Sequence, residues 1–216
     1  MRRKLNDLFI YHSNLDSRDT IKLLIAFEHG NLKQISAYLN VKNVNQSIGV
    51  CGFLPLELSI IYDHKHVFDY IVHQLNANLN IKNKSFETMP FIALAFQRQS
   101  YLFSLLNLDM SCLYDCTNDT QRTLMHQAAI SGDTEIVRRL LEDFGFYKNL
   151  NEYELQHLLY DKYDCTPLYY ACWFGCVEIV DLLLNACFDK SNDFSVTRLN
   201  VLKHNKKSIN LTHFID

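Results

Sequence analysis

An internal repeat constrains the fold of this chain more than any other feature of the sequence. With Ala171 as the reference position, similar surroundings recur at Ala26, Ser59, Leu94 and Ala128. Three of the four steps are 33, 35 and 34 residues long, and the fourth, of 43 residues, contains an insertion of about ten. A repeat of this length commonly holds one pair of short helices, so the sequence predicts an all-α chain of about five helix-turn-helix repeats.

The rarest residues fall at matching positions in successive repeats. Gly30, Gly132 and Gly175 each follow a reference position by four residues, where a first helix must end and turn back. Each of the three prolines precedes a reference position by four residues, in the first turn of a helix, where a missing N–H is tolerated. These prolines are Pro55, Pro90 and Pro167. Their placement indicates where the first helices begin.

Residues 166–184 resemble the ankyrin repeat at nearly every position, beginning with Thr166 and Pro167. In the preceding repeat, Thr123 and His126 fill the positions where this family joins a threonine and a histidine by a hydrogen bond. The resemblance implies an ankyrin-repeat solenoid, in which each pair of helices covers the apolar side of the next.

The resemblance implies that residues 1–189 form the repeat domain, with an atypical N-terminal cap. Residues 190–216 are predicted to form a helical C-terminal capping segment, and residues 146–160 contain the insertion, with a short helix of its own. Repeats two and three keep the proline but have Leu54 and Met89 at the threonine position. The second helices are expected to bury apolar residues at helical spacing. These residues are Ile35, Leu39, Val67, Tyr70, Ile71, Leu102, Leu105, Leu106, Ile136, Val137, Leu140, Leu141, Ile179, Val180, Leu183 and Leu184.

Composition and charge narrow the class of protein. The 216 residues are 48% hydrophobic and carry a formal net charge of −3, so the chain lacks the basic excess of a nucleic-acid-binding protein. No stretch approaches the roughly 18 apolar residues of a membrane span, and polar residues interrupt the apolar run that a signal peptide needs. Seven cysteines, an odd number without regular spacing, fit reduced thiols. We therefore expect an intracellular, cytoplasmic protein.

The histidines and cysteines do not form a recognisable metal or catalytic motif. Cys112 and Cys116 are four residues apart, as are Cys172 and Cys176, but zinc needs four convergent ligands, typically in paired Cys-x-x-Cys or Cys/His runs, and no such runs occur. Cys172 is therefore expected to be a small buried residue. Asp63, His64 and His66 fall in or beside an expected solvated turn between helices. No nucleophile elbow, phosphate-binding loop or dinucleotide motif occurs. We expect no cofactor, no metal and no catalysis, although spacing leaves a cysteine–histidine pair open.

The resemblance also indicates which residues could bind a partner. In the ankyrin family the concave face consists of the hairpin tips and of two residues near the end of each first helix. Transferring these positions to the chain gives a row of residues whose middle is unusually apolar. The candidates are the mainly aromatic members of that row, because aromatic residues dominate the energetics of many interfaces. The candidate partner-binding residues are Phe53, Ile61, Tyr62, Phe86, Phe96, Tyr163, Trp173 and Phe174. The alternative is that the insertion, the C-terminal cap or a second copy covers them, or that they turn inward.

The resemblance therefore implies a protein–protein interaction module that binds a partner protein through its concave face and hairpin tips, as a monomer or with weak self-association. The chain resembles short ankyrin proteins of viruses and intracellular bacteria in its size and in the uneven match of its repeats to the family pattern. This similarity indicates an effector that acts on host proteins in the host cytoplasm. Two alternatives stay open. One is an inhibitor or sequestering subunit of an enzyme or transcription factor, and the other is an enzyme that uses the insertion or the C-terminal segment.

Overall fold

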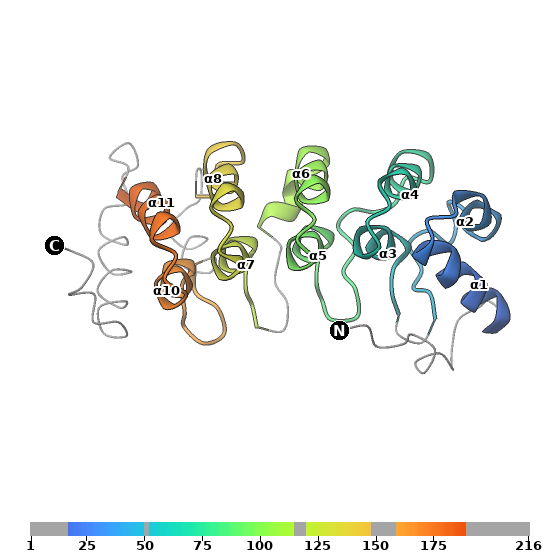
Figure 1. Cartoon of the computed structure of the whole chain (residues 1–216), viewed down its shortest axis with the longest axis horizontal. Helices are drawn as coiled ribbons and strands as arrows, with labels where there is room; N and C mark the ends of the chain where they lie inside the picture. Colours follow the sequence, from blue (N-terminus) through green and yellow to red (C-terminus); the bar gives the residue numbers. More distant parts are fainter. Residues whose placement is uncertain (1–16, 50–51, 115–119, 148–158, 189–216) are drawn as a thin grey trace. The chain divides into compact units, whose positions relative to one another are not determined.

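The computed structural model of the chain describes residues 17–49, 52–114, 120–147 and 159–188 (Figure 1). These residues form helices joined by turns and hairpins, and the β pairing among them is one isolated bridge between Ile48 and Phe53. The predicted all-α class is confirmed. The chain divides into two compact units, Met1–Asp119 (unit 1) and Thr120–Asp216 (unit 2).

The described part of unit 1 contains three pairs of helices. The first helices are α1 (Ser17–Glu28), α3 (Pro55–Ile61) and α5 (Met89–Ala95). The second helices are α2 (Leu32–Tyr38), α4 (Lys65–Asp69) with its π-helical continuation η2 (Tyr70–Gln74), and α6 (Gln99–Leu108), followed by the 3₁₀ turn η3 (Met110–Leu113). Helix α3 packs against both α1 and α5, so the first helices form one layer and the second helices another (Figure 1).

Unit 2 contains two pairs of helices in its described part. They are α7 (Leu124–Ser131) with α8 (Thr134–Glu142), and α10 (Pro167–Trp173) with α11 (Val177–Phe188). The first helices, α7 and α10, pack against each other, and so do the second helices, α8 and α11. The repeated arrangement follows from the sequence repeat, because one short pair of helices cannot bury its own apolar side.

The turns between paired helices need a left-handed residue. Gly30, Gly132 and Gly175 provide it with φ of 63°, 71° and 69°, which confirms the prediction from the glycines. In repeats two and three, Asp63 and Gln97 take the same position with φ of 62° and 58°. A non-glycine residue adopts this conformation at a cost of about 1–2 kcal/mol. The turn is therefore present in all five repeats although only three have glycine.

The reference position of repeat three was wrong by one residue. In this repeat the backbone N–H of Arg98 donates to the carbonyl of Ala93, at 2.7 Å, and not to that of Leu94. The equivalent bonds join Asn31 to Ala26, His64 to Ser59 and Cys176 to Ala171. The true reference residue is therefore Ala93.

The shift restores the threonine of repeat three. Thr88 is the N-cap of α5 and is buried, as Thr123 and Thr166 are at the N-caps of α7 and α10. Met89 is then the first helical residue and Pro90 the second, whereas Pro55 and Pro167 are first. Proline is tolerated at both positions because neither N–H has a partner within the helix. Because Pro90 occupies the second helical position, aligning the prolines of the repeats shifted the reference position of repeat three by one residue.

The core lies between the two layers of each unit. Thirteen of the sixteen apolar residues predicted to face inward from the second helices are buried, and Tyr70, Leu141 and Leu184 are half-buried. Phe27, Phe68, Tyr101 and Phe146 are among the largest fully buried side chains. The helical spacing of apolar residues therefore predicted the core correctly.

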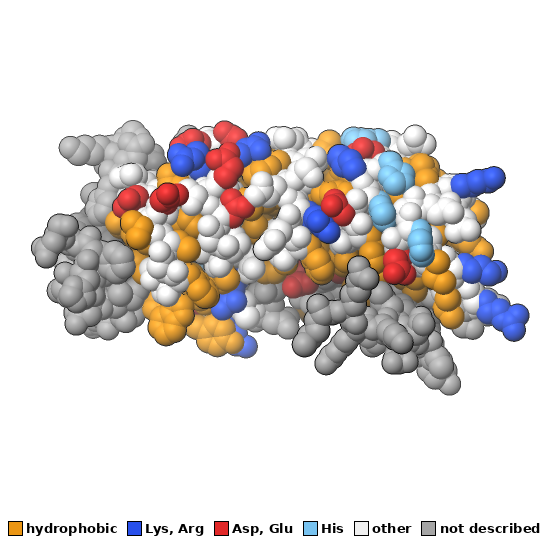
Figure 2. Space-filling model, viewed as in Figure 1, with side chains coloured by type: hydrophobic (Ala, Val, Ile, Leu, Met, Phe, Trp, Pro, Cys, Tyr) orange, Lys and Arg blue, Asp and Glu red, His pale blue; other side chains and the backbone are white. Residues whose placement is uncertain are grey.

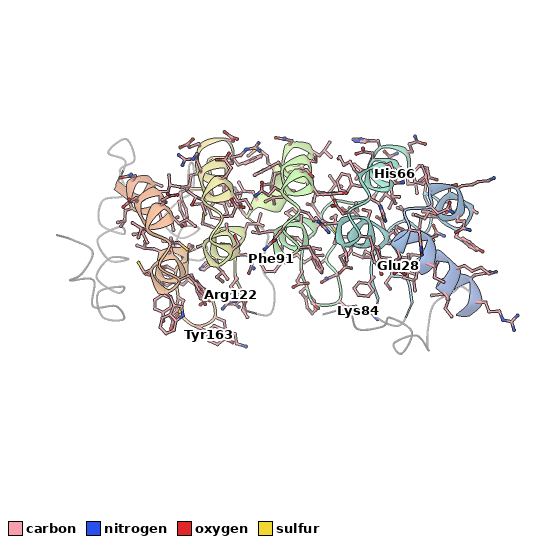
Figure 3. The ribbon with its side chains drawn as sticks, viewed as in Figure 1. Glu28, His66, Lys84, Phe91, Arg122 and Tyr163 are labelled. Carbon is pink, nitrogen blue, oxygen red and sulfur yellow. The ribbon has the colours of Figure 1, made fainter. Side chains whose placement is uncertain are left out.

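Turn residues also bond to the neighbouring repeat. His64 Nε2 lies 3.0 Å from the carbonyl of Glu28, and His66 Nε2 lies 2.7 Å from that of Gly30. Figure 2 shows histidine side chains on this face of unit 1, and Figure 3 labels His66 among them. The predicted solvated turn is thus a point of attachment between repeats one and two.

Several predictions fall on residues outside the described ranges. The C-terminal capping segment, residues 190–216, lies there, as do residues 1–16 and most of the insertion, including its expected helix. Within the described ranges, no helix is both long enough and apolar enough to cross a membrane.

Candidate partner-binding surface

Unit 1 holds five of the eight candidate residues. Ile61 is the last residue of α3, and Tyr62 and Phe96 are the C-caps of α3 and α5. Phe53 and Phe86 lie in the hairpins that precede these two helices. The side chains of Phe86 and Phe96 are exposed, at 66% and 47%, and the other three are half-buried. None of the five is turned into the core.

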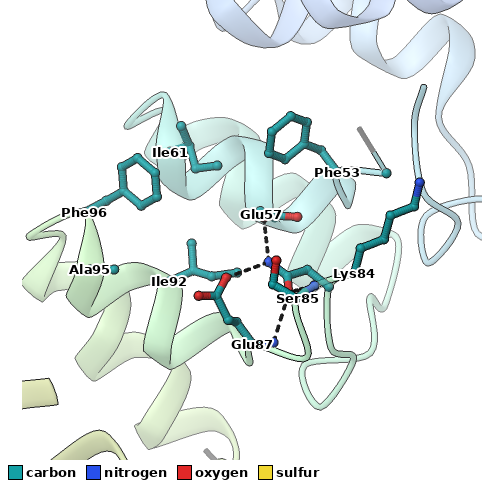
Figure 4. Close-up of a pocket in the computed structure, with 11 residues that line it drawn as sticks. Phe53, Glu57, Ile61, Lys84, Ser85, Glu87, Ile92, Ala95 and Phe96 are labelled. Atoms are coloured by element: carbon teal, nitrogen blue, oxygen red, sulfur yellow. Dashed lines mark hydrogen bonds between the residues drawn. The ribbon is translucent and has the colours of Figure 1, made fainter. Parts of the chain in front are cut away.

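Three of these residues surround a hollow in the surface of unit 1, with a volume of about 330 Å³ (Figure 4). Its apolar side is formed by Phe53, Ile61, Ile92, Ala95 and Phe96. Its polar side is formed by Gly52, Glu57, Asn83, Lys84, Ser85 and Glu87. We call this feature the unit 1 hollow. Tyr62 and Phe86 do not line it.

Asn83 organises the polar side of the unit 1 hollow. Its side-chain N–H groups donate to Glu57 Oε1 at 2.9 Å and to Glu87 Oε2 at 3.0 Å (Figure 4). Its side-chain oxygen accepts from the backbone N–H groups of Ser85 and Glu87, both at 3.0 Å. One amide therefore closes the hairpin and holds two carboxylates beside it.

The two carboxylates have no cationic partner in the part of the chain that the structure describes, where no Lys, Arg or His forms an ion pair with Glu57 or Glu87. Glu57 is only 4% exposed, and its Oε2 accepts from the Leu54 N–H at 3.0 Å. Burial raises the pKa of Glu57, and the nearby Glu87 adds to this effect, whereas the bonds from Asn83 and Leu54 oppose it. The hollow thus combines apolar walls with negative charge.

Lys84 lies along the rim of the hollow and reaches Gly52. A Cβ atom added to Gly52 would overlap Lys84 Cε and lie 2.5 Å from its Nζ, so the lysine side chain occupies the space that the glycine leaves. Gly52 also has a φ of 70°, which a side chain would disfavour.

Phe86 holds an unfavourable backbone conformation at the tip of its hairpin. Its φ is 58°, and Gly52, Gln121 and Asp164 have positive φ at the equivalent position of the other hairpins. For a non-glycine residue this conformation costs about 1–2 kcal/mol, and bulky residues rarely adopt it. Phe86 nevertheless exposes two thirds of its surface and gains little from burial in return. Such strain is common at functional positions.

Unit 2 holds the other three candidates, Tyr163, Trp173 and Phe174, which we call the unit 2 aromatic group. Their exposures are 61%, 70% and 53%. Trp173 ends α10, Phe174 is its C-cap, and Tyr163 lies in the preceding hairpin, where Figure 3 labels it. Tyr169 stacks on Trp173, with ring centroids 6.0 Å apart and an interplanar angle of 21°.

Asp161 anchors the hairpin that carries Tyr163. Its Oδ1 accepts from the backbone N–H groups of Tyr163 at 2.8 Å and Cys165 at 3.0 Å, and its Oδ2 accepts from the Tyr170 hydroxyl at 2.6 Å. Arg122 lies 3.4 Å from Oδ2 and donates to the Tyr170 hydroxyl at 2.8 Å. Burial alone would raise the pKa of Asp161, but the bonds from Tyr170, Cys165, Tyr163 and Arg122 lower it below its usual value.

The positioning roles of Asp161 and Asn83 were not predicted from the sequence. Each precedes the reference residue of its repeat, Ala171 or Ala93, by ten positions, and each accepts from the N–H groups two and four residues later. Asp and Asn form such turns readily because their side chains reach nearby backbone N–H groups. The matching position was a usable signal, but the misplaced reference of repeat three concealed it.

The predicted hydrogen bond between Thr123 and His126 is confirmed, with Oγ1 and Nδ1 2.8 Å apart. His126 Nδ1 also accepts from the Thr123 N–H at 3.2 Å, and Nε2 lies 3.1 Å from the Cys165 carbonyl, so the ring proton belongs on Nε2. His126 is fully buried, and burial lowers its pKa to about 4. This neutral histidine joins helix α7 to the hairpin before α10.

Two thiols of unit 2, those of Cys165 and Cys172, lack the environment of a catalytic nucleophile. Burial raises the pKa of Cys165 and of Cys172, whereas an activated thiol has a lowered pKa. Cys172 is half-buried, not fully buried as predicted. His126 bonds to the carbonyl of Cys165 and not to its sulfur. In the described ranges, no group of three or more His, Cys, Asp or Glu residues is placed to hold a metal ion.

Pairs of short helices joined by hairpins, with each first helix packed on the next in its own unit, define a helical-repeat protein. Residues 91–193 match the family model of ankyrin repeats, in three copies. Residues 91–193 are therefore ankyrin repeats. Members of this family are generally protein–protein interaction modules and are typically not enzymes. No curated protein matches the chain significantly.

Proposed function

We propose that the chain binds a partner protein through the exposed residues of its hairpin tips and first-helix ends, including the unit 1 hollow and the unit 2 aromatic group. The observation that carries the proposal is that an aromatic residue recurs at the end of the first helix in several repeats. Tyr62, Phe96 and Phe174 each occupy the C-cap of a first helix, and Trp173, which precedes Phe174 in the chain, is 70% exposed. Large exposed aromatic residues at repeated positions are typical of contact sites.

Two hairpins of the proposed surface, those that carry Phe86 and Tyr163, are each anchored by one side chain, which supports the proposal. Asn83 and Asp161 each bind two backbone N–H groups of their own hairpin. Phe86 keeps a strained φ in one hairpin, and Tyr163 projects from the other. Positioning residues in advance reduces the conformational entropy that binding would remove.

The experiment is capture of proteins from cell lysate, quantified by mass spectrometry. We expect Trp173→Ala with Phe174→Ala, and separately Phe96→Ala, to reduce recovery of specific partners. Val177→Ala is the matched control, because Val177 is 53% exposed but belongs to a second helix. Equal recovery by wild type and both aromatic variants would refute the proposal.

Phe86 allows binding to be separated from stability. Phe86→Gly should stabilise unit 1 by about 0.5–1 kcal/mol, because glycine tolerates the positive φ, and should reduce partner recovery. Gln121→Gly is the control, since Gln121 has nearly the same φ of 57° without an aromatic ring. Full recovery by Phe86→Gly would remove this residue from the proposed surface.

The identity of the captured protein also separates the narrower forms of this proposal. A host protein would support the effector role, and an enzyme or transcription factor whose activity falls on binding would support the inhibitor role. The similarity to short viral and bacterial ankyrin proteins favours the effector role.

A further inference from the structure

We propose that the unit 1 hollow receives a basic side chain of the partner protein, most favourably an arginine. The inference rests on the proposed function and adds the chemistry of the partner at one part of the surface. It follows from three features of the hollow, which are its charge, the arrangement of its acceptors and its apolar walls.

The charge of the hollow is negative. Its lining contains Glu57, Glu87 and a single lysine, Lys84, whose side chain lies against Gly52. Neither carboxylate forms an ion pair with a described residue. Glu57 is also almost fully buried, which makes its negative charge costly unless a cation approaches. A basic group of the partner would compensate this charge.

The acceptors are arranged for a group with several donors. The side-chain nitrogen of Asn83 lies 2.9 Å from Glu57 Oε1 and 3.0 Å from Glu87 Oε2, so the two carboxylates are close neighbours. In the described part of the chain, the second oxygen of Glu87 accepts no hydrogen bond, and this side chain is half-buried. A planar guanidinium with five N–H donors can bond to both carboxylates, whereas an ammonium acts as a single point of charge.

The walls suit the rest of an arginine side chain. Phe53, Ile61 and Phe96 line the hollow on the side opposite the polar hairpin (Figure 4). The methylene groups of arginine pack on apolar surface, and its guanidinium binds favourably over aromatic rings. A purely apolar side chain would cover the carboxylates without providing them with donors, and an acidic side chain would be repelled.

The test begins with selection of random phage-displayed peptides on the full chain. We expect the selected peptides to share an arginine next to apolar residues. Synthetic peptides are then compared with versions that carry citrulline, the neutral isostere, in place of this arginine. Binding is measured for wild type and Glu87→Gln by fluorescence anisotropy. Glu87→Gln suits this purpose because its amide oxygen can still accept from Asn83, which preserves the hairpin.

Each single change should weaken binding about tenfold, since each removes one charge-assisted hydrogen bond. The two changes together should weaken binding little more than either alone, because they remove the same interaction. Phe96→Ala should also weaken binding. Glu178→Gln removes an equal charge from an exposed position on α11 and should leave binding unchanged.

Three results would overturn the inference. The first is selected peptides without a basic residue that nevertheless depend on Phe96; the hollow would then bind a partner of other chemistry, and the proposed function would stand. The second is that citrulline and Glu87→Gln weaken binding independently, so that the double change weakens it by the product of the two single effects. The third is failure to select any peptide that depends on the hollow. The proposed function itself fails only if the aromatic variants recover partners from lysate as wild type does.

Discussion

His126 should make the stability of unit 2 depend on pH in a defined range. Its folded-state pKa of about 4 lies below the value of 6.5 expected without burial, so the folded chain binds the proton less readily than the unfolded chain does. The stabilising contribution of the neutral ring is therefore complete above about pH 6.5 and is lost as the pH falls towards 4. The structure explains this, since Nδ1 must accept from Thr123 and no space for hydration remains.

The size of this loss of unfolding free energy follows from the pKa values of His126 in the folded and unfolded states. Between about pH 7.5 and pH 4.5 the unfolded state gains nearly a whole proton at this site, and the folded state gains only part of one. The free energy of unfolding should fall by about 2.5 kcal/mol from this residue alone. His126→Asn removes the titration while its side-chain oxygen can still accept from the Thr123 N–H. The variant should be less stable at neutral pH by about 1–2 kcal/mol, because it loses the bond to the Cys165 carbonyl.

The assay is urea denaturation followed by far-UV circular dichroism, for wild type and His126→Asn at both pH values. The difference between the two proteins removes the contribution of other titrating groups, including Asp161. We expect this difference to shrink or reverse at the lower pH. An unchanged difference would show that His126 titrates alike in the folded and unfolded states, and the argument from its burial would be refuted.

Other substitutions test the hairpin anchor and the turns. Asp161→Asn should destabilise unit 2 by about 2–4 kcal/mol, because it leaves Arg122 without its buried partner. Tyr170→Phe should destabilise it by only about 1 kcal/mol, because it removes a neutral hydroxyl. Both losses are measured by urea denaturation, and equal losses would contradict the role of the Asp161 charge. Gly175→Ala should cost about 1–2 kcal/mol from its positive φ, since no atom lies within 4 Å of the added Cβ. Gly30→Ala should cost about 1–2 kcal/mol more, because the added Cβ would lie 2.7 Å from the His64 ring. Similar losses for the two glycine variants would mean that the ring moves aside freely.

Much of the fold could be predicted from local rules. Short helix pairs, left-handed turns at three glycines and inward-facing apolar residues all follow from spacing along the chain. The error in repeat three arose where two local signals disagreed. Pro90 indicated one register, and Thr88, which caps the helix in the structure, indicated the other. Because proline fits either of the first two helical positions, only the hydrogen bond from Arg98 to Ala93 decided between them.

The helix pairs, the turns within them and the candidate positions at helix ends follow from the amino-acid sequence alone, since each depends on neighbours only a few residues away in the chain. Tertiary structure alone decided how distant side chains meet. The hydroxyl of Tyr170 reaches Asp161 from a helix, and the amide of Asn83 joins Glu57 to Glu87 across two repeats. Such contacts depend on how one repeat packs on the next, and no periodicity along the chain encodes that geometry.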